Sequence, residues 1–246
     1  MLSEERKALI LEYIDQNKAV STLELMQQFN ASEATIRRDL TEMAKKGLLS
    51  KVHGGAVSLH NQIVSDYNVA DREEKNQEEK IEIARYAASL ISENDLVFLD
   101  AGTTTAYMVD FINQKNIAFV TNAVNHAQKL ARKGYPVYLT GGRLKPTTEA
   151  LIGTSCYEFI VKYQFSISFF GTNAVSHENG FMTPDPEEAK IKECALSHTL
   201  SPYVLCDHAK FDMSSSVRFA EYDKACIITS GAIPKSYKKD NTLILI

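Results

Sequence analysis

The segment NASEATIRRDLTEMAKKGLLSKVHGGAVSL, residues 30–59, constrains the fold of this chain more than any other. Ser32 can cap a helix, and the helical pattern continues to Gly47, where a left-handed stop is favoured. Two short strand-like pieces, LLSKV and AVSL, then flank His53-Gly54-Gly55. The segment therefore predicts a helix that leads directly into a tight β-hairpin.

Two more helices are expected before this segment. The first extends from Glu4 to about Gln16, where apolar residues recur at helical spacing. The second begins at Ser21, where Ser-Thr-Leu-Glu forms a capping box, and extends to about Phe29. Two helices joined by a short turn are typical of a helix-turn-helix, and a hairpin directly after the second helix of the pair is a wing.

The third helix has two contrasting faces. One is apolar and carries Ile36, Leu40, Met43 and Ala44. The other is small, polar and basic, which suits insertion into the major groove of DNA. We expect DNA contacts from Ser32, Glu33, Thr35, Arg37, Arg38, Thr41, Lys51 and His53. An ordinary three-helix bundle with solvated arginines is the alternative.

Net charge does not decide between these alternatives. The chain has 246 residues and a formal net charge of −4, so bulk positive charge does not attract nucleic acid. Between Thr35 and His53, five basic residues stand against two acidic ones, Asp39 and Glu42. A DNA interface would depend on where those side chains lie.

The chain is expected to be cytoplasmic. No run approaches the roughly 18 apolar residues of a membrane span, and the N-terminus lacks the apolar region of a signal peptide. The cysteines form no CxxC pair and the histidines no metal-ligand spacing, so we expect free thiols, no metal site and no cofactor.

The pattern changes after residue 59. We expect a DNA-binding domain over residues 1–59, a polar linker over 60–79 and a second domain over 80–246. In the second domain, helical stretches alternate with apolar strands. These strands read LVFLDA, IAFVT, PVYLTG, FSISFFGT, YVLCD, ACIITS and TLILI. The alternation predicts an α/β fold whose largely parallel sheet has helices on both faces.

Polar residues follow the strands of the second domain. The first strand ends in Asp100-Ala101-Gly102-Thr103-Thr104-Thr105, and a glycine with hydroxyls at a helix N-terminus suits a phosphate. Four later strand ends are also polar: Thr121-Asn122, Thr140 to Arg143, Gly171 to Asn173 and Asp207-His208. Because ligands bind at the carboxyl ends of parallel strands, this lining predicts a sugar phosphate. Helix capping alone is the alternative for the Gly-Thr turn.

Both halves of the chain resemble the DeoR family of bacterial transcription regulators. The N-terminal match is Ser32, Thr35 to Leu40, Gly47-Leu48 and His53 to Ala56. The C-terminal match includes DAGTTT, VTNAVNHAQKL, LTGGRLKPTTEALIG and DHAKF. The resemblance implies a winged helix-turn-helix followed by a ribose-5-phosphate-isomerase-like α/β sensor domain. The residues of these matching segments are most similar to those of DeoR-type repressors of fructose operons, which implies fructose 1-phosphate as effector.

The resemblance also implies roles for individual residues. The phosphate would bind Gly102, Thr103, Thr104 and Thr105 next to Asp100, helped by Thr121 and Asn122. The sugar would be lined by Gly141, Gly142, Arg143, Glu149, Glu188, Lys190, Asp207 and Lys210. From the residues alone, the pair Glu187-Glu188 is interpreted as the acidic first turn of a helix after Pro186.

The chain is expected to be a sensor and not an enzyme. An isomerase needs a paired acid and base, and in isomerase relatives acids occupy the segment that here reads FFGTNAV, where Asn173 stands instead. The resulting expectation is a repressor that binds operator DNA as a homodimer or tetramer and is relieved by a sugar phosphate. The alternatives are a sugar-phosphate isomerase or deaminase with an N-terminal helix-turn-helix, and an activator of the same build.

Overall fold

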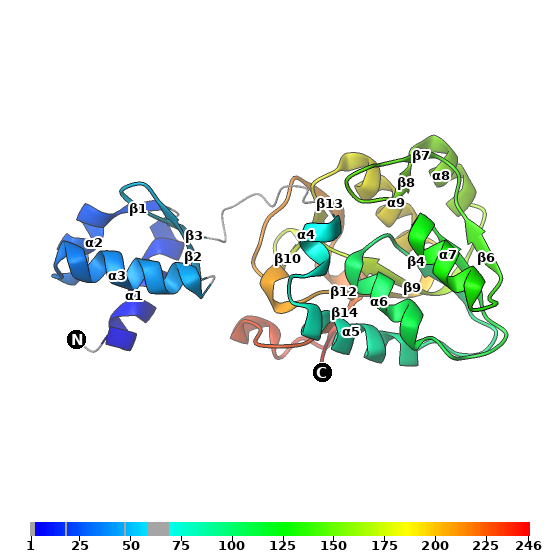
Figure 1. Ribbon diagram of the computed structural model, residues 1–246, viewed down its shortest axis with the longest axis horizontal. Coiled ribbons are helices and arrows are strands. Elements are labelled where there is room, and N and C mark those ends of the chain that lie inside the picture. Colours follow the sequence, from blue (N-terminus) through cyan, green and yellow to red (C-terminus); the bar gives the residue numbers. More distant parts are fainter. Residues whose placement is uncertain (1–2, 18, 47, 59–68) are drawn as a thin grey trace. The chain divides into compact units, whose positions relative to one another are not determined.

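The computed structural model describes residues 3–17, 19–46, 48–58 and 69–246. The chain divides into two compact units, Met1–Ile63 and Val64–Ile246, each with its own core. Figure 1 labels the helices and strands of both units. In the part of the chain that the structure describes, no helix combines the length and the apolar character that crossing a membrane requires.

The first unit contains the predicted helices and hairpin. Its elements are α1 (Ser3–Asn17), β1 (Ala19–Ser21), α2 (Thr22–Phe29), α3 (Glu33–Lys45), β2 (Leu49–Val52) and β3 (Gly55–Ser58). The capping box at Ser21 and Glu24 forms as expected, and Ser32 caps α3. The predicted stop at Gly47 lies outside the described residues; α3 itself ends at Lys45.

One strand of the first unit was not predicted. β1 pairs antiparallel with β3, so the wing is a three-stranded sheet in the order β1-β3-β2. Three residues are too few to show a strand period, and the partner of β1 lies more than 30 residues along the chain. Gly55 is required at this crossing because a Cβ there would lie 2.2 Å from the carbonyl oxygen of Val20.

The predicted buried face of α3 is confirmed. Ile36, Leu40 and Met43 are buried against Ile10 and Ile14 of α1 and Leu25 of α2. Ala44 packs at the edge of the same core. The core therefore fixes which face of α3 remains outside.

The second unit is built on a seven-stranded sheet, and all of its strand pairs are parallel. Its order is β15-β14-β12-β9-β4-β5-β6. The strands are β4 (Leu96–Leu99), β5 (Ala118–Thr121), β6 (Val137–Leu139), β9 (Phe165–Gly171), β12 (Thr199–Leu205), β14 (Cys226–Thr229) and β15 (Leu243–Leu245). All seven predicted strands are present, which confirms the predicted fold class.

Helices cover both faces of this sheet (Figure 1). On one face, α5 (Gln77–Ser89), α6 (Thr103–Phe111) and α7 (Val124–Arg132) bury apolar side chains such as Ile83, Met108 and Leu130. On the other face, α8 (Thr154–Ile160) and α9 (Pro186–Ser197) bury Ile160 and Ile191. The parallel strands therefore direct all their carboxyl ends to one edge of the sheet, between the two helical layers.

Smaller elements were not predicted. A second, antiparallel sheet contains β10 (Ala174–Ser176), β11 (Gly180–Thr183) and β13 (Val217–Ala220), and β7 (Arg143–Leu144) pairs with β8 (Leu151–Ile152). Short 3-10 helices lie at His208–Lys210, Tyr222–Lys224 and Lys235–Tyr237. The predicted linker over 60–79 needs correction, because α4 (Val69–Glu73) and the start of α5 are helical and belong to the second unit.

Candidate nucleic-acid interface and ligand cavity

The outer face of α3 carries the predicted DNA-contacting residues. Ser32 accepts a hydrogen bond from the backbone amide of Thr35 at 3.3 Å, which holds the N-terminal turn of the helix. Arg37 and Arg38 are both exposed. Arg37 forms an exposed ion pair with Glu33 at 2.6 Å, whereas no ion-pair partner of Arg38 is present among the described side chains. Arg38 is therefore the more available of the two guanidinium groups.

The wing is tied to this helix by a side-chain contact. Lys51 Nζ on β2 donates to Thr41 Oγ1 at 2.8 Å, and the Thr41 hydroxyl donates to the carbonyl oxygen of Arg37 at 2.6 Å. His53 is exposed in the turn between β2 and β3. All eight predicted residues are thus exposed or half-buried on α3 and the adjoining wing.

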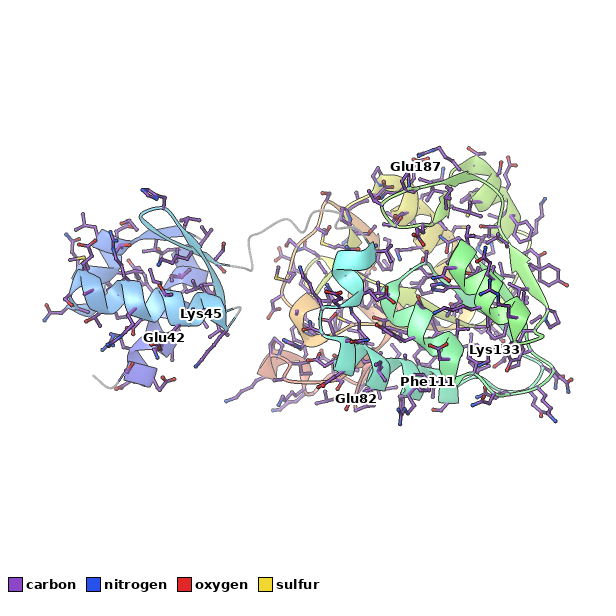
Figure 2. All side chains as sticks on the ribbon, viewed as in Figure 1. Glu42, Lys45, Glu82, Phe111, Lys133 and Glu187 are labelled. Carbon is purple, nitrogen blue, oxygen red and sulfur yellow. The ribbon has the colours of Figure 1, made fainter. Side chains whose placement is uncertain are left out.

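The two acidic residues of this region are turned away from the exposed face. Asp39 is fully buried and accepts from Arg6 Nε of α1 at 2.7 Å. Glu42 accepts from Lys7 Nζ of α1 at 2.5 Å, and this hydrogen bond lowers the pKa of its carboxyl group. Figure 2 shows Glu42 with Lys45 on the last turns of α3. Basic side chains of α1 therefore neutralise the charges of Asp39 and Glu42, so these two carboxylates oppose DNA binding less than their number suggests.

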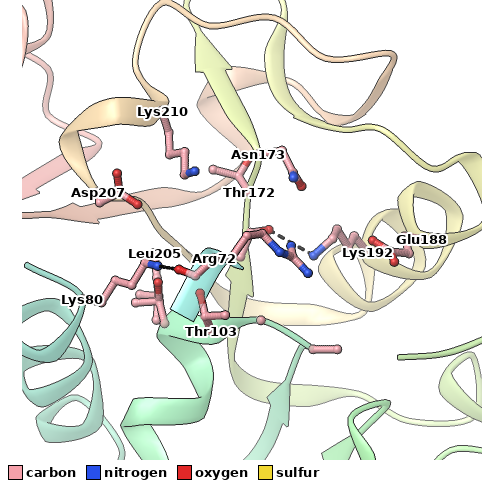
Figure 3. A pocket seen from close by; sticks show the side chains of 14 residues that line it. Arg72, Lys80, Thr103, Thr172, Asn173, Glu188, Lys192, Leu205, Asp207 and Lys210 are labelled. Atoms are coloured by element: carbon pink, nitrogen blue, oxygen red, sulfur yellow. Dashed lines mark hydrogen bonds between the residues drawn. The ribbon is translucent and has the colours of Figure 1, made fainter. Parts of the chain in front are cut away.

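A cavity opens at the carboxyl edge of the large sheet, beside the N-terminus of α6 (Figure 3). This first cavity encloses about 40 Å³, enough for a few water molecules by the usual measure. Its lining residues come from α4, α5, α6, α9 and the ends of β4, β9 and β12. They include Gly102, Thr103, Thr104, Glu188, Asp207 and Lys210, all of which were predicted.

Cationic side chains dominate this cavity. Arg72, Lys80, Lys192 and Lys210 line it together with only two carboxylates, Glu188 and Asp207. Burial lowers the pKa of Lys80 to about 8, since desolvation disfavours the charged ammonium. With the first backbone amides of α6 alongside, the cavity is suited to an anion.

Asp100 and Lys192 form a buried ion pair at the base of this site. Lys192 Nζ also donates to the carbonyl oxygen of Gly171 at 3.0 Å, and the Gly171 amide donates to Asp100 at 3.1 Å. Burial raises the pKa of the Asp100 carboxyl, and the neighbouring ammonium opposes that shift. The pair joins the end of β4 to the end of β9 and to α9.

Three predicted residues hold the end of β4 and the turn that leads from it into α6. Thr105 Oγ1 donates to the carbonyl oxygen of Asp100 at 2.7 Å. Thr121 Oγ1 donates to the carbonyl oxygen of Leu99 at 2.6 Å, and Asn122 Oδ1 accepts from the Ala101 amide at 3.0 Å. All three side chains are buried outside the first cavity, so they position the turn.

A second cavity of about 40 Å³ lies on the other side of the same turn. It shares Ala101, Gly102 and Thr103 with the first cavity and adds Glu149, among other residues. Glu149 adopts a left-handed backbone conformation with φ of 54°. His126 lines this cavity, and burial lowers its pKa to about 4, so its imidazole is neutral at pH 7.

Four predicted sugar-contacting residues lie outside both cavities. Gly141, Gly142 and Arg143 are exposed, and Arg143 pairs with Glu187 at 2.5 Å. Figure 2 labels Glu187 on the outside of the second unit. Lys190 is exposed as well, and its ammonium lies 5.0 Å from the centre of the Tyr157 ring. The lysine of α9 that reaches the first cavity is Lys192.

Glu187 and Glu188 both lie in the acidic first turn of α9, as interpreted, and Glu188 in addition lines the first cavity. Glu188 is 8% exposed and accepts from Lys145 Nζ at 3.1 Å and from Thr148 Oγ1 at 2.5 Å. It thereby ties the loop after β7 to α9 at the cavity. Lys192 was not predicted to line the cavity. Because it follows Glu188 by four residues, the two side chains lie on the same face of α9, and this spacing was the sequence signal that could have identified Lys192.

Among the residues that the structure describes, one group of side chains has the composition of a metal site. Ligand atoms of Glu79, Asp207 and His208 lie within 4.8 Å of one another. Glu79 already accepts from the backbone amide of His208 and lies 2.6 Å from its Nδ1, while Asn76 donates to Asp207 at 2.8 Å. These contacts explain the cluster as the junction of α5 with the 3-10 helix at His208–Lys210.

Comparisons with known proteins agree with both halves of this description. Residues 6–62 match the model of the DeoR-like helix-turn-helix domain, and residues 75–231 match that of the DeoR C-terminal sensor domain. A ribose 5-phosphate isomerase A from Neisseria gonorrhoeae superposes with a TM-score of 0.39 at 15% identity, covering 54% of this chain and 52% of that chain. That likeness is too slight to carry an argument.

Several relatives match over nearly the whole chain. The HTH-type transcriptional regulator FruR of Bacillus subtilis is 44% identical, covering 94% of this chain and 92% of the relative. GlpR of Haloferax volcanii is 34% identical over 98% and 94%, respectively. A lactose phosphotransferase system repressor of Staphylococcus aureus is 32% identical over 91% and 90%. This chain therefore belongs to the DeoR family of helix-turn-helix transcriptional regulators.

Proposed function

We propose that this protein is a repressor of a sugar-utilisation operon whose hold on operator DNA is relieved by a sugar phosphate. The outer face of α3 would enter the major groove, and Lys51 and His53 of the wing would contact backbone phosphates. Because operators usually contain two half-sites, the reading unit would be a homodimer or tetramer. The protein would act in the cytoplasm and need no cofactor.

The first cavity is the observation that supports a sugar phosphate as the effector. It combines three ammonium groups, a guanidinium group and the N-terminus of α6 within a partly buried site. Such a site favours a phosphate, while Glu188, Asp207 and Asn173 offer acceptors or donors for sugar hydroxyl groups. We propose fructose 1-phosphate because the sequence resembles fructose-operon repressors and because a relative at 44% identity carries the name FruR.

A sensor role without turnover is part of the proposal. An isomerase would need a carboxylate free to move a proton between adjacent carbons. Glu188 is engaged by Lys145 and Thr148, and Asp207 accepts from Asn76 and from the Ala209 amide. Asn173 accepts from Thr183 at 3.2 Å and offers no acid.

Two measurements on the full chain test this proposal. Fluorescence anisotropy with promoter fragments of fructose-utilisation operons should show binding that weakens with salt and with fructose 1-phosphate. A thermal-shift panel should rank fructose 1-phosphate above fructose 6-phosphate, ribose 5-phosphate and inorganic phosphate. A coupling of about 1–3 kcal/mol between ligand and DNA is expected.

A matched pair of variants locates the site. Thr104→Val removes a cavity hydroxyl at nearly constant volume and should reduce the thermal shift, whereas Thr154→Val, at the exposed start of α8, should not. No thermal shift with any phosphorylated sugar would refute the effector proposal. Interconversion of the sugar phosphates at ordinary enzyme rates would refute the sensor role.

A further inference from the structure

The helix α4 contributes to both cavities. Arg72 lines the first cavity, and Val69 and Glu73 line the second. Two hydrogen bonds join the described residues of this helix to the rest of the second unit: the Val69 amide donates to the carbonyl oxygen of Thr147 at 3.2 Å, and Lys80 Nζ donates to the carbonyl oxygen of Arg72. A helix of five residues has little stability of its own, so its position depends on these contacts.

Arg72 is the unusual member of the cavity. Its side chain points into the first cavity, toward Lys192 (Figure 3). Its Nε is buried, and this group has no hydrogen-bond partner among the described residues. A buried donor without an acceptor is costly, and an anion would supply the acceptor that Arg72 lacks. A guanidinium group can also bind a phosphate with two parallel hydrogen bonds.

The neighbours of Arg72 strengthen this argument. Lys80, Lys192 and Lys210 line the same cavity, so without an anion Arg72 faces other cations in a partly buried space. Lys192 is offset by Asp100, but the Arg72 guanidinium has no such counter-ion in the described part of the chain. A bound dianion would turn this repulsion into attraction and would hold α4 against the cavity.

We propose that Arg72 is a direct ligand of the effector's anionic group, and that this contact makes the docking of α4 depend on the effector. This inference rests on the proposed function. α4 is joined through residues 59–68 to the wing strand β3 of the first unit, so it is the element of the cavity nearest in sequence to the DNA-reading unit. Occupancy of the cavity would thus reach the DNA-binding unit through the chain that connects them.

The proposal separates Arg72 from the other cavity residues. The lysines and threonines would contribute to effector affinity alone. Arg72 would contribute to effector affinity and would also couple occupancy of the cavity to DNA binding. A ligand shifts an equilibrium only by its difference in affinity for the two states. Removal of the Arg72 contact should therefore reduce the operator response even when enough ligand is added to saturate the cavity.

The test compares Arg72→Gln with Arg85→Gln in the full chain. Arg85 is exposed on α5 and lies over the Phe111 ring at 5.0 Å, so it controls for loss of an arginine. Titration calorimetry with fructose 1-phosphate and with inorganic phosphate gives affinity. Hydrogen exchange of residues 69–73 reports the docking of α4, and operator affinity with and without saturating fructose 1-phosphate reports transmission.

In the parent protein and in Arg85→Gln, fructose 1-phosphate should slow exchange of residues 69–73 at least tenfold and weaken operator binding. In Arg72→Gln, ligand affinity should fall by about 10- to 100-fold, the range of a lost charge-assisted hydrogen bond. At saturation its operator affinity ratio should approach one. Arg72→Lys, which keeps the charge but not the paired donors, should give intermediate values and serves if Arg72→Gln does not fold.

The outcomes distinguish the two proposals. If the parent protein binds none of the phosphorylated probes, the effector proposal and this inference both fail. If it binds them, but Arg72→Gln and Arg72→Lys match it in affinity, exchange and operator response, only the role of Arg72 is overturned. If Arg72→Gln loses affinity yet responds fully at saturation, Arg72 is a ligand and the transmission part is overturned.

Discussion

Replacement of Lys192 by methionine gives the sharpest test of the site, because Lys190 provides a matched control on the same helix. Lys192 is 4% exposed and pairs with Asp100, which is 2% exposed. Lys190 is exposed, and its ammonium lies over the Tyr157 ring at 5.0 Å from the ring centre. The two substitutions remove the same charge from one helix, at positions with different environments.

The expected magnitudes follow from burial. Loss of one partner from a buried ion pair costs about 3–5 kcal/mol, because the other charge is left without compensation. For a chain of this size, about 1 kcal/mol shifts Tm by roughly 2–4 °C, so Lys192→Met should lower Tm by about 6–20 °C. Lys190→Met loses an exposed cation–π contact of about 0.5–1 kcal/mol, so its Tm should fall by about 1–4 °C.

A double-mutant cycle gives the control. Asp100→Asn combined with Lys192→Met removes both charges, and the double variant should be more stable than Lys192→Met alone. Thermal unfolding followed by circular dichroism measures all five proteins: the parent, Lys192→Met, Asp100→Asn, the double variant and Lys190→Met. Equal Tm values for Lys192→Met and Lys190→Met, or additive losses in the double variant, would refute the buried pair and the site built on it.

Three further outcomes are expected. The affinity for fructose 1-phosphate should fall up to tenfold per pH unit above about 8, because a bound anion favours the protonated form of Lys80. Titration calorimetry from pH 7 to 9.5 measures this affinity, and a Lys80→Met variant should show a flatter pH profile. The charged groups acting on this ammonium are Asp207, Lys210, Arg72 and Glu73. Gly55→Ala should destabilise the first unit by about 1–3 kcal/mol in urea unfolding because its Cβ would meet the Val20 carbonyl oxygen, and an unchanged stability would count against this close approach. Gly54→Ala, with open space around it and φ of 87°, should cost about 1–2 kcal/mol through backbone strain alone. Arg38→Ala should weaken operator binding more than tenfold in anisotropy while its circular dichroism spectrum matches that of the parent, and unchanged affinity would remove this residue from the interface.

Local patterns predicted most of the elements correctly. The capping box at Ser21 and Glu24, the apolar face of α3 and the seven apolar strands all appear where short-range spacing placed them. Each of these signals lies within one helix or one strand, so it can be recognised without knowledge of distant contacts. β1 was missed because its pairing with β3 is set by the wing and not by its own three residues.

The site was predicted less completely. The strand-end rule pointed to Gly102 to Thr104, Gly171 to Asn173 and Asp207, which line the first cavity, because parallel strands bring their carboxyl ends together in any such sheet. The family resemblance suggested Lys190, yet the rotation of α9 on the sheet directs Lys192 into the cavity. Arg72 and Lys80 lie in or next to a stretch that the sequence alone presented as a polar linker.

The sequence by itself thus predicted the two-part architecture, the basic face of α3 and the edge of the sheet at which a ligand would bind, since periodicity, capping and the polar residues that follow each strand are properties of neighbouring residues. Only the tertiary structure decided which charges meet. It turned Asp39 and Glu42 toward α1, joined Asp100 to Lys192 across 92 positions of the chain and placed Arg72 in the cavity. Such pairings depend on how helices pack on a common core, and no spacing along the chain encodes them.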